Sequence, residues 1–170
     1  MTDYNHYCCE RAQRIPSTPQ LLDHDLAMMS CALSILDASQ QNTTIEIPIA
    51  AIITHPQHGI IAQAHNACIS TQDPTAHAEI CALRQAGKYL GNYRLNECTL
   101  YVTLEPCPMC FFALQNARIA RIVYAAHDRQ YGFLSRRQFP HHSHHFCWRG
   151  GVLAEDAQSV LEQFFRDRRN

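Results

Sequence analysis

Two helix-start signals in the middle of the chain constrain its fold more than any other feature. Asp73-Pro74-Thr75 places an acceptor side chain and a proline where a helix begins, and Cys107-Pro108 repeats the pattern. The apolar run 99–103 between them predicts a buried strand. We expect the first helix to end at Gly87 and the second to span residues 108–116. The sequence therefore predicts two helices with a strand between them.

Side chains that bind metals lie at both predicted helix starts. His77 follows the first signal, and Cys107 and Cys110, three residues apart, share one face of the second helix. One imidazole and two thiolates suit zinc, and three protein ligands leave a position for water, which is the catalytic rather than the structural arrangement. A helix N-terminus also favours thiolates over thiols. These residues predict a catalytic Zn2+ centre.

A carboxylate accompanies the predicted ligands. Glu79 lies two residues beyond His77, close enough to move protons without coordinating the metal. Such a site suits the addition of hydroxide to an amino-substituted, electron-poor ring carbon, followed by loss of ammonia. The alternatives are a structural zinc knuckle or a Cys-x-x-Cys pair of free thiols, neither of which needs this carboxylate. The pattern therefore favours a hydrolytic active site.

The remaining sequence alternates between helical and strand patterns. Apolar residues at three- and four-residue steps predict a helix over 20–38, with an inward face made of Leu22, Leu26, Met29, Leu33 and Leu36. A strand is expected over 45–53, where Pro48 indicates an edge or an irregular start. The other expected segments are a turn at 55–59, strands at 60–64, 119–125 and 146–148, a loop at 88–96, and a C-terminal amphipathic helix from Leu153 to Phe165. This order predicts the α/β class, as a three-layer α/β/α sandwich with helices on both faces of a mixed sheet.

The chain reads as one folded domain, residues 19–170, preceded by a flexible N-terminal arm, residues 1–18. The cluster His141–His145 is interpreted as a solvated loop, with metal binding as the alternative. The sequence shows no bilayer-spanning apolar run and no export signal, so we expect a cytoplasmic protein with reduced cysteines and no membrane contact.

Charge is unevenly distributed along the chain. The formal net charge of −1 gives no overall signature of a nucleic-acid-binding protein, but arginines gather after residue 117. This asymmetry indicates either a local anionic partner or a set of solvated arginines.

The segments His77-Ala78-Glu79 and Pro106-Cys107-Pro108-Met109-Cys110 match the H-x-E…P-C-x-x-C signature of zinc deaminases. With them, the chain from about Leu26 to Arg169 resembles the cytidine/deoxycytidylate deaminase superfamily and, within it, the bacterial tRNA adenosine deaminases. Further segments that carry the resemblance are 73–80, 92–95, 101–107 and 151–169. The resemblance implies a cytidine deaminase-like fold and a homodimer. It also implies His77, Cys107 and Cys110 as zinc ligands, with Glu79 as the proton shuttle.

The same resemblance suggests substrate contacts. It implies that Asn66 hydrogen-bonds the target nucleotide and that Asp128 lies in the nucleic-acid contact loop. Phe164, with its neighbouring aromatic residue and arginines, would help to hold an anticodon loop. Ala78 is the remaining expected substrate-binding residue.

Three hypotheses about function stay open at this stage. The first is conversion of adenosine to inosine at the wobble position of tRNA, with a single-stranded loop whose base is turned out into the pocket. The second is deamination of a free base or nucleoside such as guanine, cytosine or cytidine. It is motivated by Phe111, Phe112 and Tyr131, which together with the unusual segment 133–148 would close a small pocket. The third is a catalytically silent zinc protein, which the presence of Glu79 argues against.

Overall fold

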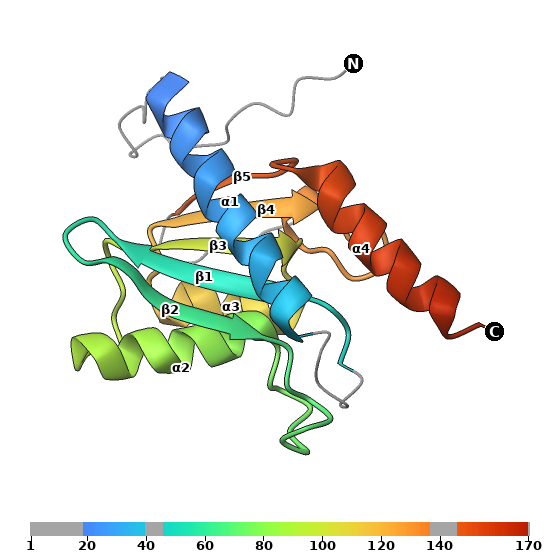
Figure 1. The fold of residues 1–170 in the computed structure, drawn as a ribbon. Helices are drawn as coiled ribbons and strands as arrows, with labels where there is room; N and C mark the ends of the chain where they lie inside the picture. The colour runs from blue at the N-terminus through green and yellow to red at the C-terminus, as the bar shows by residue number, and fades with distance from the viewer. Residues whose placement is uncertain (1–18, 40–45, 137–145, 170) are drawn as a thin grey trace.

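The structure, a computed structural model, describes residues 19–39, 46–136 and 146–169 (Figure 1). Helices and strands alternate along the chain, as expected. In chain order they are α1 (Pro19–Ser39), β1 (Ala50–His55), β2 (Gly59–His65), α2 (Ala78–Leu90), β3 (Thr99–Leu104), α3 (Pro108–Asn116), β4 (Arg121–Ala126), the 3-10 turn η1 (Leu134–Arg136), β5 (Cys147–Arg149) and α4 (Ala154–Asp167).

A mixed sheet forms the middle layer, with the strand order β2-β1-β3-β4-β5. β1 pairs antiparallel with β2 and with β3, whereas β3, β4 and β5 are parallel. α3 is the crossover between β3 and β4, because parallel neighbours cannot be joined by a tight turn. β1, β3 and β4 are buried along most of their length, which accounts for their nearly continuous apolar sequences.

Helices cover both faces of this sheet (Figure 1). α1 and α4 lie on one face, where Met29 and Ala157 belong to the same apolar cluster. α2 and α3 lie on the other face, where Ala82 and Phe111 belong to the second cluster. The predicted three-layer α/β/α sandwich with a mixed sheet is confirmed.

The inward face of α1 differs from the prediction in its first half. Leu22 and Leu26 are 41% and 37% exposed, and the buried positions are instead Asp25, Met29, Ala32 and Leu36. An acidic residue thus occupies a core position that the apolar pattern assigned to leucines. It can do so because a buried charge is tolerated when it is paired.

The partners of Asp25 come from three strands on the same side of the sheet. Arg121 donates Nη1–H to Oδ1 and Nη2–H to Oδ2, both at 2.6 Å, and Arg149 donates Nη1–H to Oδ2 at 3.0 Å. The Tyr101 hydroxyl donates to Oδ1 at 3.2 Å. Arg121 and Arg149 are therefore neither solvated nor available to an external anionic partner, the two roles predicted for the arginines after residue 117. They bind an internal carboxylate.

Strand β1 begins later than predicted. Pro48 precedes it, and a tight turn in which the Ile49 N–H donates to the Ile47 carbonyl at 2.8 Å lies immediately before the strand. Proline cannot donate to a sheet ladder, so pairing starts only at Ala50.

The end of α2 was also placed too early. Gly87, predicted as the stop, lies inside the helix, and Gly91 ends it with a left-handed backbone at φ 61°. Glycine reaches this conformation without the steric cost that other residues incur. The predicted loop 88–96 is correspondingly shorter.

Two sequence-based expectations fall outside the described residues: the flexible arm over 1–18, and the His141–His145 cluster. Within the described ranges, the helices are too short or too polar to cross a lipid bilayer.

Candidate active site

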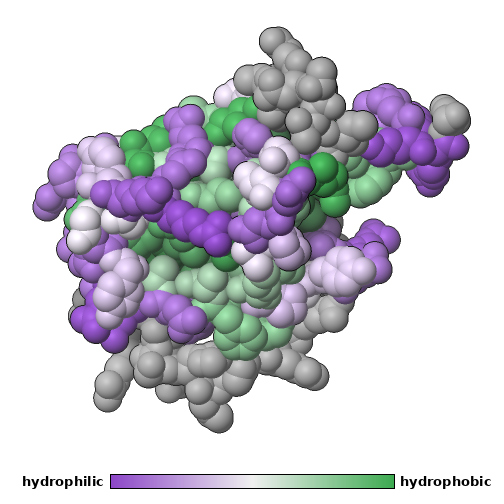
Figure 2. Space-filling model, turned by 90° about the horizontal axis from the view of Figure 1, so that it is seen from below, coloured by the Kyte–Doolittle hydropathy of each residue, from purple (hydrophilic) through white to green (hydrophobic). Residues whose placement is uncertain are grey.

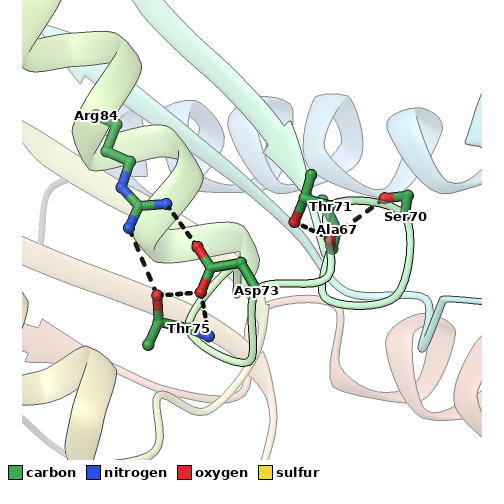
Figure 3. Close-up of polar contacts among 6 residues, drawn as sticks. All are labelled: Ala67, Ser70, Thr71, Asp73, Thr75 and Arg84. Atoms are coloured by element: carbon green, nitrogen blue, oxygen red, sulfur yellow. Dashed lines mark hydrogen bonds and ion pairs between the residues drawn. The ribbon is translucent and has the colours of Figure 1, made fainter.

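The loop between β2 and α2 determines where α2 begins (Figure 3). Asp73 Oδ1 accepts hydrogen bonds from the Thr75 backbone N–H at 2.8 Å and from its hydroxyl at 2.6 Å, and Arg84 Nη1 lies 3.3 Å from Oδ2. Asp73 therefore closes a local turn instead of capping the helix, a competition typical of short acidic side chains. The predicted helix start at 73–75 is wrong: α2 begins at Ala78, with His77 as its N-cap.

Asn66, the residue after β2, fixes the first turn of α2. Its side chain is buried, and Oδ1 accepts the Ala78 N–H at 2.9 Å. This satisfies one of the N–H groups that a helix start leaves without an intrahelical partner. His77 precedes this point with an extended backbone, and its carbonyl accepts the first helical hydrogen bond from Cys81.

The structure brings His77, Cys107 and Cys110 together from two helix starts. Cys107 is the N-cap of α3, with an extended backbone like that of His77, and Cys110 follows in the first turn. The ligand atoms of the three residues lie within 4.8 Å of one another. His77 Nδ1 is 3.7 Å from Cys107 Sγ and 3.5 Å from Cys110 Sγ.

These separations fit a tetrahedral zinc ion. Zn–S bonds near 2.3 Å and Zn–N bonds near 2.0–2.1 Å, at tetrahedral angles, place nitrogen and sulfur ligands about 3.6 Å apart. The donor set is the one zinc prefers, and its three members leave one tetrahedral position for another molecule. His77, Cys107 and Cys110 thus form a group that can hold a metal.

Hydrogen bonds prepare one of the thiols to bind as a thiolate. Bonds from Cys110 and then from His77 lower the pKa of Cys107 to about 4, although burial opposes this shift. The hydrogen bond between the two cysteines, together with burial, raises the pKa of the Cys110 thiol. The bond to Cys107 raises the pKa of His77. Because metal ligands must be deprotonated, a thiolate at Cys107 favours metal binding.

Glu79 lies in the first turn of α2 beside this group. Its side chain is only 4% exposed. Burial raises the pKa of Glu79 to about 7, and the Cys107 thiolate adds to this effect, while His77 and a hydrogen bond with Cys110 oppose it. A carboxyl with a pKa near neutrality can both take up and release a proton under physiological conditions.

The sequence model for the cytidine and deoxycytidylate deaminase zinc-binding region matches residues 22–126, which include every residue of this site. The chain belongs to this deaminase family. Its match to a zinc-binding family agrees with the His77, Cys107 and Cys110 geometry.

Individual relatives support the assignment. The deaminase is 41% identical, over 86% of each chain, to the tRNA-specific adenosine deaminase of Haemophilus influenzae. A solved structure described as a tRNA:A34 deaminase has a TM-score of 0.70 and 33% identity, covering 79% of this chain and 99% of that one. A guanine deaminase from Bacillus subtilis has a TM-score of 0.56 and 40% identity, covering 59% of this chain and 63% of that one. The predicted resemblance to this superfamily and to its tRNA adenosine deaminases is confirmed, and the chain is a hydrolytic deaminase.

The other residues expected to contact substrate lie on three different elements. Ala78 is fully buried and, through its N–H, is bound to Asn66. Asp128 organises its own turn, since Oδ1 accepts the N–H groups of Gln130 and Tyr131 at 2.8 and 2.9 Å. Phe164 is half-buried on α4, on the opposite face of the sheet from the metal-binding helix starts. Ala78 therefore lies in the helix start that carries His77 and Glu79, whereas Phe164 lies on the other face of the sheet.

The Arg168 guanidinium lies 3.5 Å from the centroid of the Phe164 ring and donates to the Phe164 carbonyl. This places an aromatic residue and a cation side by side near the C-terminal end of the chain.

Phe111 has a structural place that the sequence did not reveal. It is fully buried, and its ring lies 4.5 Å from that of Phe133 and 5.5 Å from that of Phe146. Phe111 thus fills the core between α3 and the segments that follow β4, rather than closing a small pocket. Phe112, its neighbour, is 37% exposed.

Glu105 is a buried acid next to the site that the sequence reading did not single out. It is 2% exposed and lies two residues before Cys107. The available signal was its position, an acidic residue directly after a buried strand and directly before the Pro-Cys-x-x-Cys segment.

Proposed function

We propose that this deaminase converts adenosine to inosine in tRNA, at the wobble position of the anticodon loop. The observation that carries the proposal is the 41% identity, over 86% of each chain, to a tRNA-specific adenosine deaminase. At such a level of similarity along the whole domain, the substrate class is expected to be shared together with the fold. The target base would have to leave the stack of the loop and enter the site.

The metal-binding group would hold Zn2+ through His77 Nδ1, Cys107 Sγ and Cys110 Sγ. Zinc bound there supplies Lewis acidity, which makes water nucleophilic near neutral pH. Glu79 would accept a proton from the attacking water and deliver it to a ring nitrogen of adenine, then take the remaining proton from the oxygen added at C6 and pass it to the departing amine. Water adds at C6, the bond from C6 to the exocyclic nitrogen breaks, and ammonia leaves.

Substrate contacts are proposed for four further residues. Because Asn66 Oδ1 is bound to the helix start, its amide N–H2 is the end of the side chain that would donate to the nucleotide. Ala78 would line the site beside it. The turn built by Asp128 would face the loop of the RNA. Phe164, with Arg168, would provide a stacking and charged contact at a second position.

Dimer formation and location belong to the same proposal. Met109 and Phe112 of α3 are 36% and 37% exposed. Figure 2 shows apolar surface on the α2 side of the molecule, next to hydrophilic residues. A homodimer that covers this side would remove the apolar area from water. A tRNA substrate would be met in the cytoplasm.

Zinc content tests the ligand assignment directly. We expect one Zn2+ per chain in the wild-type protein. In Cys110→Ala we expect less than a tenth of that amount, because the two protein ligands that remain are too few to retain zinc. Atomic absorption on protein dialysed against metal-free buffer measures this. The matched control is Cys98→Ala: Cys98 is also buried, and burial raises the pKa of its thiol to about 11. Full zinc in Cys110→Ala, or equal loss in both variants, would contradict the assignment.

The substrate is tested by ammonia release. Zinc-loaded protein should release ammonia from an anticodon stem-loop with adenosine at the wobble position, and not from free adenosine, guanine, cytosine or cytidine. Binding to the stem-loop should weaken steeply as salt is raised, because phosphate contacts release counterions. Turnover of free adenosine with none of the stem-loop would overturn the proposal.

A free-base substrate is the second candidate. The similarity to a guanine deaminase from Bacillus subtilis, at 40% identity over 59% of this chain, favours it. The aromatic residues that the sequence analysis expected to close a small pocket support this candidate less, because Phe111 packs in the core. Ammonia release from guanine but not from the stem-loop would establish this candidate.

A further inference from the structure

The Glu105 carboxylate lies between the metal-binding segment, residues 105–107, which presents the ligand Cys107, and the loop that follows β4. Oε1 accepts the Ser135 N–H at 2.6 Å, and Oε2 accepts the Asp128 N–H at 3.3 Å. His127 Nδ1 lies 3.4 Å from Oε2. Both oxygens of one buried carboxylate are thus bound to backbone groups at the two ends of the loop 128–135.

The main chain beside Glu105 holds the same loop. The Glu105 N–H donates to the Ala126 carbonyl at 2.9 Å, at the end of β4. The Phe133 N–H donates to the Pro106 carbonyl at 3.1 Å, in the middle of the loop. Since Pro106 is followed directly by Cys107, the loop is anchored on the segment that presents a metal ligand.

Gly132 closes the loop over the carboxylate. Its N–H donates to the Asp128 carbonyl at 3.0 Å. A Cβ atom at this position would meet that carbonyl oxygen and would lie 2.5 Å from Glu105 Oε2. Any residue other than glycine would therefore push the carboxylate away or open the turn. The loop conformation and the Glu105 side chain depend on each other.

We propose that Glu105 is a positioning residue that holds the loop 128–135 against the metal-binding segment 105–107 and so sets one rim of the active site. The loop displays Tyr131, which is 60% exposed, above a turn that Asp128 closes. Where this inference concerns RNA, it rests on the proposed function. The loop would then contact the nucleotides beside the target base. Glu105 acts through this loop and does not touch the reacting atoms.

The test replaces Glu105 by glutamine, which has the same shape but puts an N–H2 donor in place of one acceptor oxygen. One backbone N–H at 128 or 135 then loses its partner and faces another donor. In zinc-loaded Glu105→Gln we expect amide hydrogen exchange to accelerate at least ten-fold over residues 127–136 and to stay unchanged over α2 and β4. KM for the substrate should rise about ten-fold, with kcat changed less than three-fold. Zinc content should equal that of the wild-type protein.

The matched control is Glu97→Gln, the same chemical change at a side chain that is 65% exposed. It should leave exchange, KM and zinc content as in the wild type. Gly132→Ala is the second variant, because it disturbs the same contact from the loop side while the carboxylate remains. It should reproduce the local exchange and the KM effect, and the double variant should be little worse than either single one.

Unchanged exchange over 127–136 in both Glu105→Gln and Gly132→Ala would overturn the inference. So would loss of zinc or faster exchange throughout the domain in both variants, because Glu105 would then support the fold as a whole. The exchange readout needs no substrate. If the wild type deaminates a free base instead of the stem-loop, the proposed function fails, while the role of Glu105 is still decided by exchange and by KM for that base.

Discussion

Replacing Glu79 by alanine should lower kcat by a factor of about 10²–10⁴ and leave zinc bound, because general acid–base catalysis typically contributes that much. The carboxylate is nearly excluded from solvent, and burial raises its pKa to about 7. It can therefore take a proton from water and return one to the leaving group at the pH of the cell. Glu79 is not among the three residues whose ligand atoms cluster, so its removal should spare the metal.

Ammonia release under saturating substrate measures the loss, and atomic absorption measures the zinc. Glu79→Gln is the isosteric companion: it keeps the volume of the side chain and removes its ability to accept a proton, so it should lose as much activity as alanine. Glu97→Ala, a truncation of an exposed acid, is the control. Near-normal kcat in Glu79→Gln would show that another group carries the proton.

The two helix-start signals differed in how well they predicted structure. The segment Cys107-Pro108 predicted α3 to the residue, because proline fits the first helical position and Cys107 precedes it as the N-cap with an extended backbone. Asp73-Pro74 looked the same in sequence, but Asp73 accepts hydrogen bonds from Thr75 and closes a turn that begins five residues before the helix. The error in the start of α2 did not affect the predicted ligand group. That prediction required only that His77 and the cysteines lie near two helix starts, not at a particular turn of either helix.

Long-range polar pairing was the part that the sequence did not reveal. The inward face predicted for the first helix did not include Asp25, and Arg121 and Arg149 were counted only among the arginines that gather after residue 117. Their contacts join positions 96 and 124 residues apart in the chain. Only the order of strands in the sheet, with β4 beside β5 and α1 across them, places these charges together. The contacts of Glu105 could not be predicted for the same reason: its partners lie more than twenty residues away in the chain.

The second large effect concerns stability. Asp25→Asn should lower the free energy of unfolding at pH 7 by about 3–5 kcal/mol, because removing one charge of a buried pair leaves the other uncompensated. Arg121 is only 11% exposed, and the carboxylate it faces is fully buried. A loss of this size is a large share of the roughly 5–15 kcal/mol that stabilises a typical domain. Urea denaturation followed by circular dichroism measures it, and Asp23→Asn, an exposed acid on the same helix, is the matched control.

The pH dependence of this difference tests its cause. Burial raises the pKa of Asp25, but the hydrogen bonds and charges of Arg121 and Arg149 outweigh burial and hold that pKa below its usual range. A carboxyl with a lowered pKa in the folded state contributes stability above its unfolded pKa of about 3.9, and this contribution is lost as pH falls through the folded value. The gap between wild type and Asp25→Asn should therefore be constant from pH 7 to about pH 5 and shrink in more acidic solution. A gap that persists undiminished to pH 2 would mean that the asparagine disrupts packing, and that the ion pair is not what Asp25 contributes.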